Sequence, residues 1–297
     1  MTFSSKVKDE LLNIETIKPC CILAECYGLL LFGRGFSAGE VYISTENKNV
    51  AFRYKELVER FTENPCDVSE SASGKIKVSV GNKQDRLAVL NAFGYNGKER
   101  TRRLNWANIS EDCCIGSFLR GVFLACGTVN SPEKNYHLEF VVPHMYLSRD
   151  LQKFLSDNDM AAKEVTRNGA YVLYFKDSGE IEDVLTVMGA SNCVLELMGV
   201  KMYKDMRNNV NRRLNFESAN LDRTVNAALV QIDAINRLKK CGMLNDLPSE
   251  LREIAELRTE NPDFSLKQIG DSMSVPMTRS GVNHRLKKLC ALAEKCK

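Results

Sequence analysis

One short motif occurs twice in this chain of 297 residues, and it constrains the fold more than any other feature. An apolar stretch that ends in small residues runs from Tyr27 to Gly35 (YGLLLFGRG) and again from Leu119 to Gly127 (LRGVFLACG). The two final glycines lie 92 positions apart. Because each stretch is apolar and carries several small residues, the chain is predicted to contain two related buried helices.

Further matches follow the motif in the same order, which distinguishes a duplicated domain from two similar helices. The matched segments are 41–45 with 137–141, 54–58 with 150–154, 73–80 with 168–175, and 87–94 with 182–189. The offset is 95 in the last two pairs, and such an insertion is best tolerated in a surface loop. Each copy, at about residues 21–95 and 114–190, is predicted to form helix, two strands, helix, strand pair, helix.

The composition predicts a globular protein of two or three domains. Hydrophobic residues make up 44% of the chain and charged residues 27%. The longest apolar stretch, residues 22–32, contains Glu25 and is much shorter than the roughly 20 residues that cross a bilayer. The first ten residues are polar and include acids, unlike a secretory leader. We therefore expect a cytoplasmic protein without a membrane partner.

The eleven cysteines have no metal-binding spacing that can be recognised in the sequence. None forms a CxxC pair, and neither adjacent pair, Cys20-Cys21 or Cys113-Cys114, is expected to present both thiolates to one tetrahedral metal ion; the three histidines are distant from both pairs. The sequence therefore predicts neither a metal site nor a cofactor. We expect reduced thiols that act mostly as small buried hydrophobic groups.

The net charge of +3 hides an asymmetry between the two ends of the chain. Residues 200–297 carry 18 Lys or Arg and 12 Asp or Glu, whereas residues 1–199 carry 23 and 26. An excess of basic residues at one end is typical of a module that binds a polyanion.

The two motif helices resemble the LAGLIDADG signature of homing endonucleases. That resemblance implies two αββαββα halves related by a pseudo-two-fold axis, with an acid before each final glycine that holds divalent metal ions. Here those former metal-site positions are Arg34 and Cys126. An arginine repels a cation, and a thiol is too soft for Mg²⁺. The sequence therefore predicts a protein that is not an enzyme.

Small residues of the motif predict close packing of the two helices. They are Gly33 and Gly35 in the first copy, and Gly121, Ala125 and Gly127 in the second. Leu29 aligns with the first glycine of the family motif, which predicts a looser approach in the first copy.

In nucleases of this fold, a saddle-shaped sheet lies along the DNA. The residues expected on the corresponding strands are a sparse basic set with two tyrosines: Lys48, Arg53, Lys75, Lys77, Arg167, Lys176, Tyr42 and Tyr171. Contact with DNA, contact with a protein partner and a merely solvated face are therefore alternatives for the sheet.

The region after Gly199 changes in composition and is predicted to be helical and basic. Residues 199–220 look like a basic linker or a helix, with Arg207, Arg212 and Arg213 available to phosphates. Apolar residues with helical spacing predict a helix over 221–240 that ends at Cys241-Gly242. A further helix is predicted from Ser249 to the break at Asn261-Pro262.

The segment from about residue 265 to 291 predicts a helix-turn-helix. A short helix starts at Ser265, a turn covers 274–277, and a second helix is capped by Thr278. Helical spacing leaves donor-rich side chains on the outer face of the second helix: Arg279, Ser280, Asn283, His284 and Lys287, flanked by Arg285 and Lys288. Arg and Asn can form bidentate pairs with guanine and adenine. Lys267 is a further candidate for a phosphate contact. The alternative is a helical hairpin with a solvated basic face.

Taken together, the chain is similar to the WhiA family of bacterial regulators. The segments that carry this similarity are FSSKVKDE at 3–10, NRRLNFESANL at 211–221 and TRSGVNHRL at 278–286. The resemblance implies a C-terminal domain like the promoter-reading part of sigma factors. It also implies roles in transcription control, sporulation septation, cell division and chromosome segregation.

The predicted fold class is α+β. An N-terminal segment (1–20) precedes a duplicated LAGLIDADG-like domain (21–198), and the linker leads to an all-α domain (221–297). The primary hypothesis is a transcriptional regulator associated with the nucleoid, bound to promoters or chromosomal DNA and partnered by a second regulator or a cell-division protein. The alternatives are a division-linked scaffold or nucleoid-associated protein with incidental DNA binding, and a nuclease.

Overall fold

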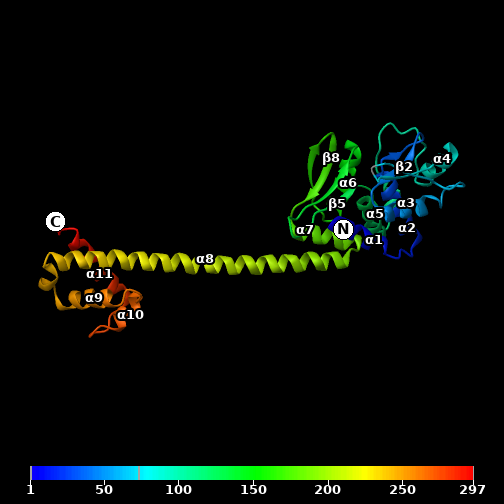
Figure 1. The fold of residues 1–297 in the computed structure, drawn as a ribbon. Coiled ribbons are helices and arrows are strands. Elements are labelled where there is room, and N and C mark those ends of the chain that lie inside the picture. Colours follow the sequence, from blue (N-terminus) through cyan, green and yellow to red (C-terminus); the bar gives the residue numbers. More distant parts are fainter. Residues whose placement is uncertain (1, 73, 297) are drawn as a thin grey trace. The chain divides into compact units, whose positions relative to one another are not determined.

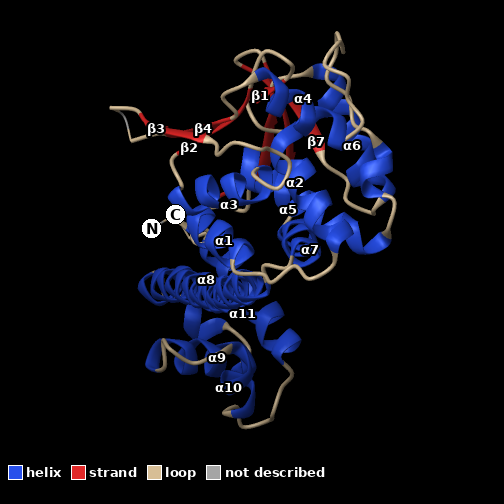
Figure 2. Ribbon diagram, turned by 90° about the vertical axis from the view of Figure 1, so that its right-hand side faces the viewer, coloured by secondary structure: helices blue, strands red, loops and turns tan. Residues whose placement is uncertain are grey.

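The computed structural model describes residues 2–72 and 74–296, which divide into two units between Tyr203 and Lys204 (Figure 1). All strands of the described residues belong to the first unit, whereas the second is helical (Figure 2). The fold is therefore α+β, as the sequence predicts. No helix among the described residues is both long and apolar enough to cross a membrane.

The first unit contains two copies of the same succession of elements, which confirms the predicted duplication. The first copy consists of α2 (Pro19–Leu31), β1 (Gly35–Phe36), β2 (Val41–Thr45), α3 (Lys48–Val58), β3 (Asp67–Glu70), β4 (Ile76–Ser79) and α4 (Lys83–Ala92). The second consists of α5 (Asp112–Cys126), β5 (Gly127–Val129), β6 (Leu138–Val142), α6 (Met145–Asp157), β7 (Lys163–Arg167), β8 (Ala170–Phe175) and α7 (Ser178–Met188). A short 3₁₀ helix, η1 (Trp106–Ile109), lies between the copies.

Both sheets are antiparallel and have the same topology. Their strand orders are β1-β2-β4-β3 and β5-β6-β8-β7. The hairpin glycines Gly74 and Gly169 have φ of +77° and +78°, and Gly94 and Gly189 follow α4 and α7 with φ of +79° and +97°. All four angles lie in the left-handed region that favours glycine. The spacing of 95 between the late parts of the copies is thereby confirmed.

The predicted match between β2 and β6 is wrong by one residue. Val41 and Ile43 face the core in the first copy, and Leu138 and Phe140 do so in the second. Val41 therefore corresponds to Leu138 rather than to His137. A shift of one residue would exchange the two faces of the strand, so burial decides the alignment where residue identity cannot.

Helices α2 and α5 cross at the pseudo-two-fold axis through Gly28 and Gly121. A Cβ atom on Gly28 would lie 2.5 Å from the carbonyl oxygen of Phe118 and 2.8 Å from the amide nitrogen of Val122. A Cβ on Gly121 would lie 2.9 Å from the amide nitrogen of Leu29 and closer still to the carbonyl of Glu25. The predicted looser approach in the first copy is therefore wrong, because Gly28 replaces Leu29 as the contact residue.

A buried carboxylate joins the two copies beside this crossing. Glu25 is 1% exposed, and its two oxygens accept hydrogen bonds from Arg53 of α3 at 2.8 Å and from Arg120 of α5 at 3.2 Å. Arg53 thus lies on a helix rather than on the sheet where the sequence analysis placed it. A buried charge is tolerated only when it is paired, and Glu25 has two partners.

The N-terminal segment is part of the first unit. Helix α1 (Phe3–Leu12) is capped by Thr2 and buries Phe3, Val7 and Leu11 in the same core as the motif helices. The predicted segment 1–20 is therefore built into the core from its third residue.

Residues 199–220, predicted as a basic linker or a helix, are helical. They lie within α8 (Ser191–Lys240), which begins in the first unit and ends in the second. Its end at Lys240 agrees with the predicted stop, since Gly242 has φ of +75°. No proline occurs between Ser191 and Lys240, so nothing in the backbone interrupts the helix.

The second unit packs the end of α8 against four short elements. These are η2 (Met243–Asp246), α9 (Ser249–Glu260), α10 (Leu266–Asp271) and α11 (Arg279–Ala293). Their core contains Leu238, Ile254, Ile269, Val282 and Leu286. Cys241 and Cys296 form a disulfide, so the prediction of reduced thiols is wrong for this pair. The two cysteines lie 55 positions apart, and only the tertiary fold brings them together.

Candidate DNA-binding interface

Helices α10 and α11 form the predicted helix-turn-helix. Ser265 caps α10 in a reciprocal capping box with Gln268, and the Thr278 hydroxyl accepts a hydrogen bond from the Gly281 amide at the start of α11. Val282, Leu286 and Leu289 of α11 are buried against the core. The caps fix where each helix begins, and the buried stripe fixes which face of α11 points outward.

Gly270 allows the close approach of α10 to the turn. A Cβ atom there would collide with the carbonyl oxygen of Met277 and would lie 3.2 Å from the Val282 side chain. The Met277 amide donates a 3.0 Å hydrogen bond to the carbonyl oxygen of Gly270. The turn is therefore held by backbone contacts that any side chain at residue 270 would disturb.

The structure divides the predicted DNA-binding residues of α11 into three sets. Ser280, His284, Lys287 and Lys288 are exposed on the outer face of the helix. Arg279 is exposed at the first turn, and Asn283, one turn later, is half-buried. Arg285 is also half-buried, and its guanidinium donates to Glu250 of α9, with a shortest distance of 2.6 Å. This ion pair ties α11 to α9, so Arg285 is less available to a ligand than its neighbours.

Arg279 and Asn283 line a groove that the sequence analysis did not anticipate. The groove has a volume of about 670 Å³ and lies between α8 and the helix-turn-helix, within the second unit. Four cationic side chains and no carboxylate are among its lining residues. The cations are Arg223, Arg258, Lys267 and Arg279. Such a groove favours an anion such as a DNA phosphate.

Arg258 has an unusual position in this groove. It is 2% exposed, and one of its terminal nitrogens donates to the carbonyl oxygens of Pro262 and Phe264 at 3.2 and 2.8 Å. Its Nε has no hydrogen-bond partner among the described residues, and burial lowers the pKa of this guanidinium. Arg258 falls within the helix predicted from Ser249, and no local signal in the sequence distinguishes it from other arginines.

The predicted phosphate contacts on α8 are solvent-accessible. Arg207, Arg212 and Arg213 are all exposed. Arg213 forms an ion pair with Glu217 one turn later, at 2.9 Å. Exposed pairs of this kind contribute at most about 1 kcal/mol, so a phosphate could replace the carboxylate at little cost.

The end of α2, where the first nuclease acid would stand, is occupied by an arginine from elsewhere in the chain. Counted from the Gly28–Gly121 contact, Gly33 corresponds to Cys126, so the predicted position Arg34 is one residue too late; Arg34 is exposed. Arg102 donates to the carbonyl oxygens of Leu31 and Gly33 at 3.4 and 3.0 Å, and burial lowers its pKa. This cation satisfies the carbonyl groups at the helix end and would repel a metal ion.

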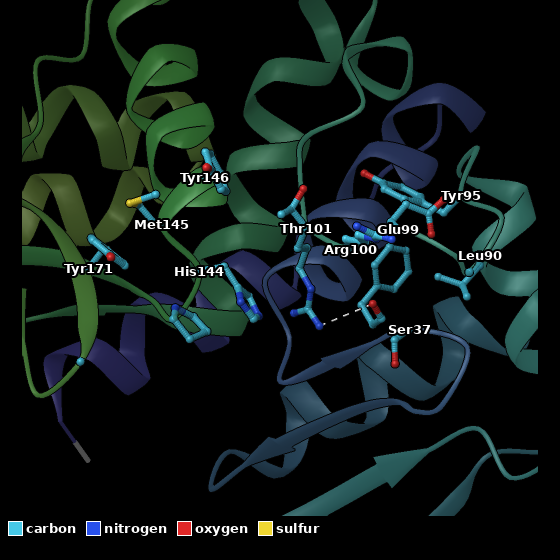
Figure 3. Close-up of a pocket in the computed structure, with 15 residues that line it drawn as sticks. Ser37, Leu90, Tyr95, Glu99, Arg100, Thr101, His144, Met145, Tyr146 and Tyr171 are labelled. Atoms are coloured by element: carbon cyan, nitrogen blue, oxygen red, sulfur yellow. Dashed lines mark hydrogen bonds between the residues drawn. The ribbon is translucent and has the colours of Figure 1, made fainter.

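Arg102 also borders a cavity of about 430 Å³ between the two copies. Figure 3 shows Ser37 and Tyr95 of the first copy on one side and His144 and Tyr146 of the second on the other. The only carboxylate among its lining residues is Glu99, which accepts a hydrogen bond from the Asn96 amide. One acid cannot replace the pair of carboxylates that a two-metal nuclease requires.

The corresponding end of α5 is occupied by a lysine. Lys8 of α1 donates to the Leu124 carbonyl oxygen at 3.3 Å, and its ammonium lies 5.7 Å from the centre of the Phe123 ring. Burial lowers the pKa of Lys8 and raises the pKa of Cys126 to about 12. The thiol at the second former acid position is therefore neutral near pH 7 and is no ligand for a hard metal ion.

The sheets offer few cations that lack a partner. Lys48, like Arg53, lies in α3 rather than on a strand. Lys77 lies over the ring of Tyr42 at 4.3 Å, and Arg167 pairs with Glu139 at 2.8 Å. These internal contacts favour a solvated or protein-facing surface over a DNA saddle.

The fold and the site define a protein in which a LAGLIDADG-like domain without its metal-binding acids is joined to a helix-turn-helix domain. Residues 115–207 match the family described as "WhiA LAGLIDADG-like domain", and residues 210–293 match "WhiA C-terminal HTH domain". The chain belongs to the WhiA family.

Two curated relatives are each named "Probable cell division protein WhiA". The protein from Thermoanaerobacter sp. (strain X514) is 44% identical, and the alignment covers 100% of this chain and 98% of the relative. The protein from Alkaliphilus metalliredigens is 36% identical over 99% and 98% of the two chains.

The crystal structure of full-length DUF199/WhiA from Thermotoga maritima has the same fold. It aligns with a TM-score of 0.61 and 24% identity, over 100% of this chain and 99% of that one.

Proposed function

We propose that this protein is a DNA-binding transcriptional regulator that acts in bacterial cell division, including sporulation septation and chromosome segregation. It binds double-stranded DNA at promoters, works with a second regulator or a division protein, and resides in the cytoplasm on the nucleoid. The observation that carries the proposal is the first half of α11, where exposed donor side chains adjoin a cationic groove whose lining contains no carboxylate.

In this proposal, some of these side chains contact base edges and the others contact phosphates. Helix α11 enters the major groove with its first turns, where Arg279, Ser280 and Asn283 meet base edges. His284, Lys287 and Lys288 lie further along the exposed face and meet the DNA backbone. Lys267 and Arg223 of the groove, with Arg207, Arg212 and Arg213 of α8, add phosphate contacts that set affinity rather than sequence preference.

The ends of the motif helices indicate that the protein does not cleave DNA. Lys8 and Arg102 donate to carbonyl oxygens at the ends of α5 and α2, and neither former acid position carries a carboxylate. The first unit would then act as a rigid scaffold that holds α8 or contacts a partner.

The central test measures DNA binding by the Arg279→Ala variant. Binding sites are first selected with wild-type protein from random duplexes and by genome-wide footprinting. Fluorescence anisotropy should then show Arg279→Ala losing about 1–3 kcal/mol of specific binding and its preference at one base pair. Lys267→Ala should instead weaken binding to all sequences and lower the salt slope by about 1.

Arg60→Ala is a matched control, because it removes one exposed arginine from the turn that follows α3 in the first unit. Unchanged affinity and preference in Arg279→Ala would refute the assignment of this residue. Footprints spread evenly over the chromosome would favour the rival class, a nucleoid-associated or scaffold protein with incidental binding. Cleavage of a plasmid in Mg²⁺ that is abolished by mutating an acidic residue would restore the nuclease hypothesis.

A further inference from the structure

The two adjacent cysteine pairs lie at equivalent places in the duplicated domain. Cys20 and Cys21 are the second and third residues of α2, and Cys113 and Cys114 are the second and third residues of α5. Each cysteine is 93 positions from its counterpart, which is also the spacing of the crossing glycines Gly28 and Gly121. The pseudo-two-fold axis brings the two glycines into contact. It therefore also brings the two cysteine pairs together, at the N-terminal ends of α2 and α5.

The four thiols form one cluster. Their sulfur atoms all lie within 4.8 Å of one another, and the sulfurs of Cys20 and Cys113 are 3.8 Å apart. A tetrahedral zinc ion with Zn–S bonds of about 2.3 Å has sulfur atoms about 3.8 Å apart. In the metal-free fold, the distances between the four sulfur atoms are therefore already close to those of a tetrahedral zinc–thiolate site.

Burial and the helix N-termini act in opposite directions on the cluster, since burial raises the pKa of Cys21 and raises that of Cys114 to about 12. Both helices begin beside the cluster, and neither N-cap residue, Lys18 or Glu111, makes a side-chain capping hydrogen bond. The amide groups and dipoles of two helix N-termini favour thiolates over thiols. Four thiolates on one Zn²⁺ leave a net charge of −2, which these dipoles partly offset.

Accessibility allows a metal ion to enter. Cys113 is exposed and Cys20 is half-buried, whereas Cys21 and Cys114 are buried beneath them. An ion can reach the two outer sulfurs from solvent and then engage the two inner ones.

The ligand set selects a soft or borderline metal. Four sulfur donors without a carboxylate favour Zn²⁺ over Mg²⁺, Mn²⁺ or Ca²⁺. The cluster also lies at the opposite ends of α2 and α5 from the former nuclease positions, about 20 Å away along helices of this length. It is therefore unrelated to the cleavage chemistry of the ancestral fold.

We propose that Cys20, Cys21, Cys113 and Cys114 bind one structural Zn²⁺ ion that clamps the two motif helices together at their N-termini. Four thiols each release a proton as four Zn–S bonds form. The clamp holds the crossing of α2 and α5 and, through it, the relative position of the two copies.

The test measures metal content and coordination in the full-length protein. Protein purified from zinc-supplemented cells should contain about one zinc per chain by plasma mass spectrometry. After removal of zinc, Co²⁺ should produce the intense visible bands of tetrahedral cobalt bound to thiolates. A zinc chelator should lower the thermal midpoint of the first unit, and added Zn²⁺ should restore it.

Two double variants locate the site. Cys20→Ser with Cys113→Ser should abolish zinc retention and the cobalt bands, while its circular dichroism stays close to that of metal-free wild type. The matched control, Cys126→Ser with Cys290→Ser, removes two half-buried thiols outside the cluster and should keep both signals.

Four outcomes would overturn the proposal. The first is wild-type protein that binds neither zinc nor cobalt while all four thiols react with a thiol reagent. The second is a disulfide between Cys20 and Cys113 instead of a metal site, and the third is the absorbance of an iron–sulfur cluster. The fourth is full zinc content in the Cys20→Ser, Cys113→Ser variant. The cobalt spectrum of wild type decides the question even if that variant fails to fold.

Discussion

Substitution of Gly28 by alanine tests the central contact of the first unit. An added Cβ would lie 2.5 Å from the Phe118 carbonyl oxygen and 2.8 Å from the Val122 nitrogen. Ordinary contacts of a methyl group begin near 3.4 Å, so the helices must separate by about 1 Å. Both obstructing atoms are backbone, so no side-chain rotation can relieve the overlap.

The expected loss follows from two opposing effects. Overpacking against a rigid backbone costs about 3 kcal/mol, at the upper end of the usual range, because α2 and α5 must part along their whole crossing. Alanine recovers up to about 1 kcal/mol through its higher helix propensity. The net destabilisation is about 2 kcal/mol, which lowers the thermal midpoint of a unit of this size by about 4–8 °C.

Gly199→Ala is the matched control, because Gly199 lies on the exposed face of α8 with no atom within 4 Å of an added Cβ. It should stabilise the protein by up to about 1 kcal/mol, so the two substitutions are expected to have opposite signs. Calorimetry and urea unfolding of the full-length protein measure both. A Gly28→Ala variant as stable as wild type would refute the argument that the two copies depend on backbone contact at this glycine.

Two further predictions concern buried carboxylates. Glu25→Gln should destabilise the first unit by about 3–5 kcal/mol in urea unfolding, because buried Arg120 loses its charged partner and Arg53 keeps only Glu56; a loss below about 1 kcal/mol would contradict this role. Hydrogen bonds from the Glu63 amide and the Asn64 side chain hold the pKa of Asp85 below its usual 3.8. The stabilisation from Asp85 should therefore be present above that pH and lost as the pH falls below it. Urea midpoints of wild type should drop on acidification more than those of Asp85→Asn, and parallel curves would disprove the linkage.

The ends of the two motif helices show how this fold is built without carboxylates at the family's metal-binding positions. The carbonyl groups at the ends of α2 and α5 still need partners, since helix C-termini carry partial negative charge. Arg102, from the segment between the copies, and Lys8, from α1, donate hydrogen bonds there. Both residues come from segments outside the repeated units, so the repeat alone did not reveal them.

Local sequence patterns were sufficient to predict much of the fold of this protein. The duplication, the order of elements in each copy, and the helix-turn-helix with its caps at Ser265 and Thr278 follow from hydrophobic periodicity, glycine positions and capping residues. These signals act over a few residues, so the sequence contains them directly. The absence of acids at Arg34 and Cys126 was equally visible.

Other features depend on residues that are distant in sequence. Four such features arise only when separate segments of the chain pack together. They are the helix contact at Gly28 rather than Leu29, the Glu25–Arg120 ion pair, the groove beside Arg258 and the Cys241–Cys296 disulfide. The four-cysteine cluster is the clearest case, because each adjacent pair lacks metal-binding spacing, and the pseudo-two-fold axis places their sulfurs within 4.8 Å. Spacing along the chain constrains only neighbours within an element, whereas contacts across the axis are decided by helix packing.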